Sequence, residues 1–333
     1  MWFHSLFVNC LLLAITNAEI SWNFTTTESD LIPLIVQIGT PPVDVKLKSF
    51  IGTLFSFMTD MEVPTASIHG AYDPSHSTSF QQTDVLYDFD GSVIGLIGTE
   101  TFMINSVKRT LLPFAARNDS LYAYYNGIGS LGFGRPTDNN VAQSFILSLI
   151  SGEKEKVVSF AMDFVDSPST SISHIINGTV SIGSRQPKHC SGSWLELPEV
   201  VFDYDYGQWG FKIEEISVGK YSYSVDSTAT FLLTNVAFSI PEPFLTSIIQ
   251  LMGGDVDKLT VSCDFSDDLI FTIGGQQFHL QPSDFMLQQA ATSGGQCPFL
   301  GVQKEEFFSL PATLLRNRCL LYNYENPGVA ITL

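Results

Sequence analysis

The sequence predicts a mainly β protein. Most of its hydrophobic residues fall in short runs that alternate with polar residues, and Gly, Pro, Asn and Ser separate these runs. Only residues 141–151 and 238–252 have apolar residues spaced as in a helix. The chain has 333 residues, which is enough for one large domain or two medium ones with a sizeable core.

The charge of the chain is strongly negative. Sixteen Lys and Arg residues stand against 34 Asp and Glu residues, which gives a formal net charge of −18. This charge repels the phosphates of nucleic acids and of anionic lipids. We therefore expect no nucleic-acid partner and no binding to anionic membrane surfaces.

The first 18 residues resemble a secretory signal peptide. Residues 6–15 form an apolar run, and Thr16, Asn17 and Ala18 follow it as a small-residue cleavage site. No other run approaches the roughly 20 apolar residues of a membrane-spanning helix. We expect a secreted protein, or one in the lumen of an acidic endolysosomal compartment.

The cysteines fit an oxidising compartment. Cys10 leaves with the signal peptide, and an even set remains: Cys190, Cys263, Cys297 and Cys319. Four cysteines predict two disulfides, with three possible connectivities. Three Asn-X-Ser/Thr sequons are candidate glycosylation sites, at Asn23, Asn118 and Asn177.

A hairpin is predicted near the start of the mature chain. Residues 31–38 and 43–49 read as two strands, and Pro41 and Pro42 lie in the turn between them. In the second strand, Val43, Val45 and Leu47 alternate with polar residues, as in a strand with one buried face.

The turn sequence Ile-Gly-Thr-Pro at residues 38–41 resembles the pepsin-like aspartic protease family. In that family this hairpin ends, twelve residues after its Ile, at the first catalytic loop, Asp-Thr-Gly-Ser. Here Gly52 and Thr53 match the end of that loop, but Phe50 occupies the position of the catalytic aspartate. The resemblance implies a two-lobed, mainly β fold with a central cleft between the lobes.

A second hairpin, at residues 87–98, resembles the family's flap, which closes over the substrate. Aligned on Gly91, the position of the family's flap tyrosine falls on Asp88, and Tyr87 lies one residue early. A shift by one residue turns a side chain to the other face of a strand, so we expect Tyr87 to point away from the cleft.

The second half of the chain repeats the pattern of a hairpin followed by a catalytic loop, after a lobe boundary near residue 188. We expect a signal peptide at 1–18, an N-terminal lobe at 19–188 and a C-terminal lobe at 189–333. The second catalytic loop of the family aligns with residues 227–234, which places Ser227 at the second aspartate position. Ala229 replaces a loop glycine, and Pro311 and Ala312 replace the Gly-Asp of a later family motif.

The resemblance also selects one disulfide pattern. In pepsin-like proteins a pair that corresponds to Cys263 with Cys297 closes a loop of the C-terminal lobe. Some secreted members have a further pair, which here is Cys190 with Cys319.

The loss of both aspartates predicts the loss of peptidase chemistry. An aspartic protease needs two carboxylates that share one proton across a water molecule, so that one acts as base and the other as acid. Phe50 offers no lone pair, and the Ser227 hydroxyl does not titrate near a working pH. In the rescue reading, Asp226 moves by one residue and serves as a lone carboxylate, helped by Asp88 or Asp90 from the flap. That move would take the following residues out of register with the core.

The sequence contains no motif for a metal site, a serine hydrolase or a phosphate-binding loop. The six histidines have no metal-ligand spacing, and no H-E-x-x-H, C-x-x-C or G-x-S-x-G motif occurs. The glycine-rich residues 126–134 lack the βαβ surroundings of a phosphate-binding loop. We expect no metal and no cofactor.

The sequence therefore predicts a secreted pepsin-like protein that is not an enzyme. The leading hypothesis is a monomeric pseudoprotease that binds an extended peptide or protein in its cleft without cutting it. One alternative is an active acid endopeptidase with an atypical site, and another is a secreted structural or decoy glycoprotein that uses only its surface.

Overall fold

The computed structural model describes most of the chain from residue 20 onward. The described residues are 20–27, 32–50, 57–59, 72–89, 92–117, 129–135, 145–165, 175–202, 207–233, 238–288, 291, 294–302 and 306–333.

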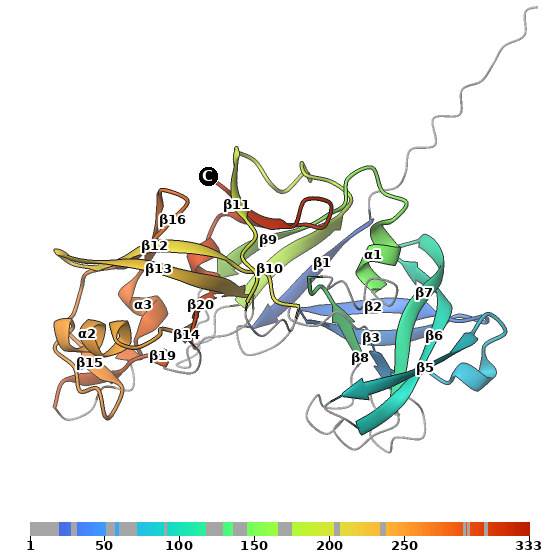
Figure 1. Ribbon diagram of the computed structural model, residues 1–333, viewed down its shortest axis with the longest axis horizontal. Coiled ribbons are helices and arrows are strands. Elements are labelled where there is room, and N and C mark those ends of the chain that lie inside the picture. Colours follow the sequence, from blue (N-terminus) through green and yellow to red (C-terminus); the bar gives the residue numbers. More distant parts are fainter. Residues whose placement is uncertain are drawn as a thin grey trace, which may run out of the picture.

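The fold is mainly β, as predicted, and three large sheets follow one another across the molecule (Figure 1). The first-half sheet has seven strands and uses only residues from the first half of the chain. Its order is β2 (Pro33–Ile38), β3 (Val43–Phe50), β8 (Gly129–Gly132), β4 (Phe57–Thr59), β7 (Val107–Arg117), β6 (Ser92–Ile104) and β5 (Gln81–Phe89).

The second-half sheet also has seven strands, all from the second half of the chain. Its order is β17 (Gln276–Leu280), β16 (Leu269–Ile273), β12 (Phe211–Val218), β13 (Tyr221–Leu232), β20 (Phe308–Pro311), β14 (Phe238–Ser239) and β19 (Gly301–Val302). A two-stranded sheet of β15 (Thr260–Ser262) and β18 (Gln296–Pro298) accompanies it.

The central sheet joins the two halves. Its six strands are β1 (Ile20–Thr27), β10 (Ile175–Ile182), β9 (Val157–Val165), β21 (Cys319–Asn323), β22 (Gly328–Thr332) and β11 (Trp194–Pro198). The first three come from the first half of the chain and the last three from the second half. The lobe boundary near residue 188 stays a prediction, and residue 188 lies between β10 and β11.

The predicted hairpins are present in the described residues. In the first, β2 and β3 pair antiparallel from Pro33–Lys48 to Ile38–Val43. Val45 and Leu47 are buried, as the alternation predicts, whereas Val43 at the turn is 42% exposed. The second predicted hairpin is the antiparallel pair β5 and β6.

Strand β1 precedes the first predicted hairpin, in a segment for which the sequence analysis predicted no strand. Ile20, Trp22 and Phe24 of β1 are buried, and β1 pairs with β10 along its whole length. The period-2 pattern of these three residues was a strand signal.

Both predicted helices are present, and the second is shorter than expected. Helix α1 spans Phe145–Ile150, and residues 141–144 lie outside the described part. Helix α2 spans Phe244–Leu251, and the start of the predicted 238–252 helix is instead strand β14. Pro241 and Pro243 explain the difference, because proline lacks the N–H that a helix interior requires. Further helical segments within the described residues are α3 (Pro282–Phe285) and the 3₁₀ turns η2 (Pro74–His76) and η6 (Ala312–Leu315).

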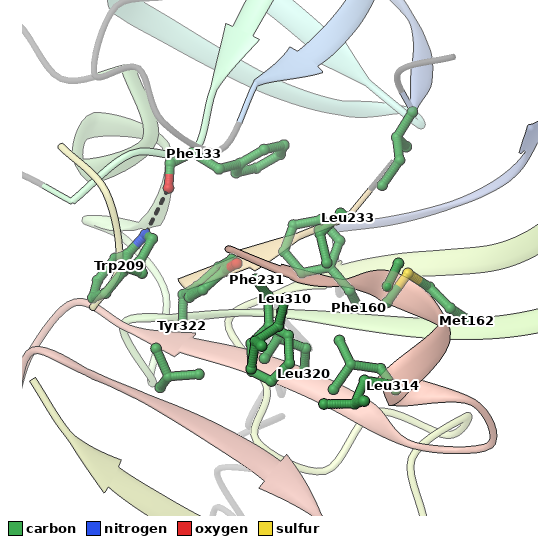
Figure 2. Packing of buried hydrophobic residues seen from close by; sticks show 14 of the residues in the cluster. Phe133, Phe160, Met162, Trp209, Phe231, Leu233, Leu310, Leu314, Leu320 and Tyr322 are labelled. Carbon is green, nitrogen blue, oxygen red and sulfur yellow. Dashed lines mark hydrogen bonds between the residues drawn. The ribbon is translucent and has the colours of Figure 1, made fainter. Parts of the chain in front are cut away.

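One large hydrophobic cluster runs through all three sheets. At the centre, Trp209 stacks on Tyr322 with ring centroids 5.1 Å apart, and Phe160 meets Tyr322 edge-on at 5.7 Å. Figure 2 shows these residues together with Phe133, from the end of β8. Contacts of this kind hold the two halves together through buried aromatic surface. None of the helices in the described part of the chain is long and apolar enough to span a membrane.

Candidate functional site

Two parallel strand pairs occupy equivalent places in the two halves. In the first half, β3 pairs parallel with β8, and the ladder ends at Phe50 opposite Gly132. In the second half, β13 pairs parallel with β20, and the ladder ends at Leu232 opposite Pro311. Each ladder spans four residue pairs and ends where its first strand leaves the sheet.

A third strand fixes the equivalence of the two ladders. Seven residues after Phe50, Phe57 of β4 pairs antiparallel with Ser130, two residues before Gly132. Seven residues after Leu232, Ser239 of β14 pairs antiparallel with Ser309, two residues before Pro311. The spacing and the pairing are the same in both halves.

This shared register bears on the second predicted catalytic position. The motif alignment places that position at Ser227, which lies opposite Ile213 of β12 and is half-buried. The strand pairing instead makes Leu232, five residues further on, the counterpart of Phe50. Neither side chain can donate or accept a proton near neutral or acid pH. Phe50 is described here by its backbone pairing alone.

Asp226, the rescue candidate, lies on the outer surface. Its side chain is 93% exposed, and its Oδ1 atom is 2.9 Å from Nζ of Lys212 on the neighbouring strand. Val225, the residue before it, is buried. Asp226 is the one acidic residue of β13, so the strand brings no carboxylate to the inner side.

The residues that replace family glycines and an aspartate are built into the core. Ala229 is fully buried, with Phe211 of β12 opposite it on one side and Phe308 of β20 on the other. Pro311 is the last residue of β20 and precedes η6, whose first residue, Ala312, is also buried. Pro311 and Ala312 therefore support packing in place of a polar loop. Ala229 corresponds to a loop glycine only in the motif alignment, because in the strand register it lies three residues before Leu232, inside β13.

The predicted flap residues are placed by their backbones only. Tyr87 pairs with Gly95, and Asp88 pairs with Val93, with a register shift between the two pairs. Gly91 lies outside the described residues, and so do Gly52, Thr53 and Asn118. The direction of the Tyr87 side chain stays a prediction.

Polar contacts tie the end of β8 to the second half. The carbonyl oxygen of Phe133 accepts a hydrogen bond from Trp209 Nε1 at 2.9 Å (Figure 2). It accepts a second one from the Tyr324 hydroxyl, also at 2.9 Å. Two residues on, the amide of Arg135 donates to the carbonyl of Gly207 at 2.7 Å. The Arg135 side chain also forms an ion pair with Glu199. These bonds hold the inner end of the first ladder against the second half.

One carboxylate in the described part is fully buried, and it belongs to the first-half sheet. Glu100 of β6 accepts hydrogen bonds from the Tyr72 hydroxyl, from Ser77 Oγ at 2.6 Å and from the Thr101 amide at 2.6 Å. Burial raises the pKa of Glu100, but the hydrogen bonds outweigh it and leave the pKa below its usual value. Burial also raises the pKa of Tyr72, so its hydroxyl stays protonated and donates. The cluster holds the η2 segment to β6 and takes no part in the two ladders.

The described residues contain no group of three or more His, Cys, Asp or Glu side chains that could bind a metal ion. The cysteines form two disulfides, Cys190 with Cys319 and Cys263 with Cys297, with the pairing that the resemblance implies. Asn23 and Asn177 are both exposed on the central sheet.

Comparisons with known proteins agree with this architecture. The family model described as eukaryotic aspartyl protease matches residues 34–333. The chain is 22% identical over 272 residues to vacuolar protease A of Arthroderma otae, which covers 77% of this chain and 66% of that protein. It is 23% identical over 315 residues to renin-2 of Mus musculus, covering 82% and 74% respectively. Pepsin A of Sus scrofa is 23% identical over 324 residues, covering 89% of this chain and 79% of that protein.

Proposed function

This chain belongs to the eukaryotic aspartyl protease family, and we propose that it is a member without peptidase activity that binds an extended peptide or protein segment between its halves. The observation that carries the proposal is the pairing of the two ladders. The equivalent ends of the ladders are Phe50 and Leu232. The aspartic protease mechanism needs a carboxylate at each of these two positions. An apolar side chain at each end leaves nothing to share a proton or to activate a water molecule.

The place of Asp226 supports the same conclusion. To act at the centre, its carboxylate would have to leave Lys212 and turn from the exposed to the buried side of β13. That rotation would displace Val225 from the core, since neighbouring strand residues face opposite sides. A lone carboxylate would in any case lack the partner that makes one group an acid while the other is a base.

We assign ligand binding to the backbone rather than to charged side chains. β5 of the flap hairpin is the last strand of the first-half sheet. An edge strand has N–H and C=O groups on its outer side that can pair with an added strand. An extended segment is the kind of ligand that such pairing recognises. The proposed location is outside the cell or in an acidic lumen, in keeping with the name of the relative vacuolar protease A.

An active acid endopeptidase is the second candidate, and family membership is the observation that favours it. The two candidates differ in one measurable property. Positioned proton transfer contributes about 10²- to 10⁴-fold to a rate, and the nucleophilic water would be lost with it. We therefore expect turnover several orders of magnitude below that of an intact relative.

The experiment uses the purified mature protein and an unfolded protein substrate at roughly pH 3 to 5, where aspartic dyads work. Pepsin A serves as the positive control. The proposal predicts no cleavage above that of a heat-denatured sample, together with retention of members of a peptide array. Cleavage that is lost in an Asp226→Asn variant would overturn it. Absence of both cleavage and peptide binding would leave the surface glycoprotein as the better description.

A further inference from the structure

Beyond this function, we propose that Asn23 and Asn177 form one paired N-glycosylation site on the outer face of the central sheet. The two sequons lie on the neighbouring strands β1 and β10 and pair in register. Asn23 lies opposite Thr179, Phe24 opposite Gly178, and Thr25 opposite Asn177. Each acceptor asparagine thus faces the threonine of the other sequon.

Hydrogen bonds connect the two sequons in both directions. The Thr25 hydroxyl donates to Oδ1 of Asn177 at 2.8 Å, and the Thr179 hydroxyl donates to Oδ1 of Asn23 at 2.8 Å. Both bonds use the amide oxygen and leave the amide nitrogen, Nδ2, which is the atom that carries an N-linked sugar. The bonds are therefore compatible with the glycosylated state.

The middle residues of the two sequons turn the acceptors outward. Phe24 is 5% exposed, and its ring lies over Gly178, where an added Cβ would come within 2.4 Å of a ring carbon. Because strand residues alternate between faces, burial of Phe24 places Asn23 and Thr25 on the outer face. Glycine at 178 makes room for the ring and lets the two triplets pair closely.

A groove of about 610 Å³ lies along this outer face, and both acceptor residues line it. Its other polar lining residues include Asp163, His189, Asn317 and Arg318, which come from β9 and from segments beside β21. Hydroxyl-rich sugars hydrogen-bond to side chains of this kind, whereas an apolar ligand would leave them unpaired. The first sugars of the glycans therefore have a polar surface on which to lie.

The site also lies at an edge. β1 is the terminal strand of the central sheet, and exposed edge strands can pair with other chains. Two glycans on β1 and β10 would cover this edge and its outer face. They would so prevent edge-to-edge association of a secreted protein.

The modification is a glycosyl transfer in the secretory compartment. The donor is an oligosaccharyl diphosphate, whose C1–O bond breaks as a bond forms between C1 and Nδ2. The amide nitrogen loses one proton, and the diphosphate leaves with the bonding electron pair. A secretory oligosaccharyl transferase catalyses the step before the strand closes on its partner.

The test is site mapping on protein secreted by a eukaryotic cell line. Enzymatic deglycosylation in ¹⁸O-water converts each glycosylated asparagine to ¹⁸O-labelled aspartate, and the intact mass reports how many glycans one molecule carries. We expect label at both Asn23 and Asn177, and intact masses that include both glycans together. Absence of label at either residue, with or without a non-covalent sugar bound in the groove, overturns the paired site.

Two threonine variants make the test specific to the pairing. Thr25→Val removes the sequon of Asn23 and the hydroxyl that bonds Asn177, so we expect loss of the label at Asn23 alone and faster release of the Asn177 glycan from native protein. Thr25→Ser is the matched control, because it keeps both the sequon and the hydroxyl, and we expect the wild-type pattern. Equal rates of release of the Asn177 glycan in the two variants would show that the Thr25 hydroxyl does not protect that glycan. If Thr25→Val is not secreted, the wild-type site mapping decides the proposal.

Discussion

Asp226 and Lys212 form an ion pair on the exposed side of β13 and β12, with Oδ1 2.9 Å from Nζ. Asp226 directly precedes the second predicted catalytic loop at residues 227–234. The ion pair holds its carboxylate at the surface, away from the centre of the molecule. The bond lies between two largely exposed side chains, 93% and 52% respectively, and solvent screens it.

The first prediction concerns this pair. Asp226→Asn should change the free energy of unfolding by less than about 1 kcal/mol, as is typical of exposed ion pairs. It should also leave cleavage of an unfolded protein at its background level. Urea denaturation and the acid cleavage assay measure the two effects. A marked drop in cleavage in the variant would show that Asp226 contributes to catalysis.

The second prediction tests which residue is the counterpart of Phe50. Phe50→Asp combined with Leu232→Asp should place two carboxylates close together, so that they repel each other at neutral pH. In a double-mutant cycle we expect a destabilising coupling of about 1 to 3 kcal/mol that disappears once the carboxylates are protonated. Phe50→Asp combined with Ser227→Asp is the matched control and should be additive. Coupling in the Ser227 pair and additivity in the Leu232 pair would favour the motif alignment over the strand register.

Neither double variant should recover the turnover of an intact relative. Pro311 and Ala312, which replace the Gly-Asp of a family motif, are buried in the core, and so is Ala229 on the neighbouring strand. A working site needs its charged groups held in place by neighbouring hydrogen bonds, which these side chains cannot supply. Turnover comparable to that of pepsin A in either variant would show that the residues around the two introduced carboxylates can still support catalysis.

The third prediction concerns acid stability. Because the pKa of Glu100 is lower in the folded than in the unfolded protein, its ionised form stabilises the fold at all pH values above the unfolded pKa of about 4.3. That contribution declines as the pH falls from there through the folded pKa. Glu100→Gln should cost about 2 to 3 kcal/mol near neutral pH, since it replaces hydrogen bonds to a charged group. The cost should shrink toward acid pH.

Urea denaturation of the wild type and the variant at a series of pH values measures this difference. Glu196→Gln provides a control, because the Glu196 side chain is 52% exposed and pairs with Arg185 at the surface. A cost for Glu100→Gln that does not vary with pH would refute the role of the ionised carboxylate.

The fourth prediction concerns the junction of the two halves. Trp209→Phe and Tyr324→Phe each remove one donor to the Phe133 carbonyl, and each leaves the other donor in place. The double variant leaves a buried carbonyl without these donors. We expect its cost to exceed the sum of the single costs by about 1 to 3 kcal/mol, the penalty for a buried unsatisfied group. Additive costs in equilibrium unfolding would mean that another group or a water molecule takes over.

Much of the scaffold could be predicted from sequence, because strands and turns have local signatures. The alternation of Val45 and Leu47 with lysines predicted a hairpin, and the proline-braced turn located it. The even number of cysteines after residue 18 predicted two disulfides. The helix at 238–252 was placed too early because apolar spacing alone outweighed the prolines at 241 and 243.

The sequence by itself determined the residue types: no aspartate at the first loop, one acidic residue in β13, and two sequons far apart in the chain. The tertiary structure decided which residues meet. It turned Asp226 toward Lys212, aligned Leu232 with the place of Phe50, and brought Asn23 beside Thr179. The physical reason is that strand register depends on hydrogen bonds between distant segments, and a shift of one residue reverses every side chain of a strand.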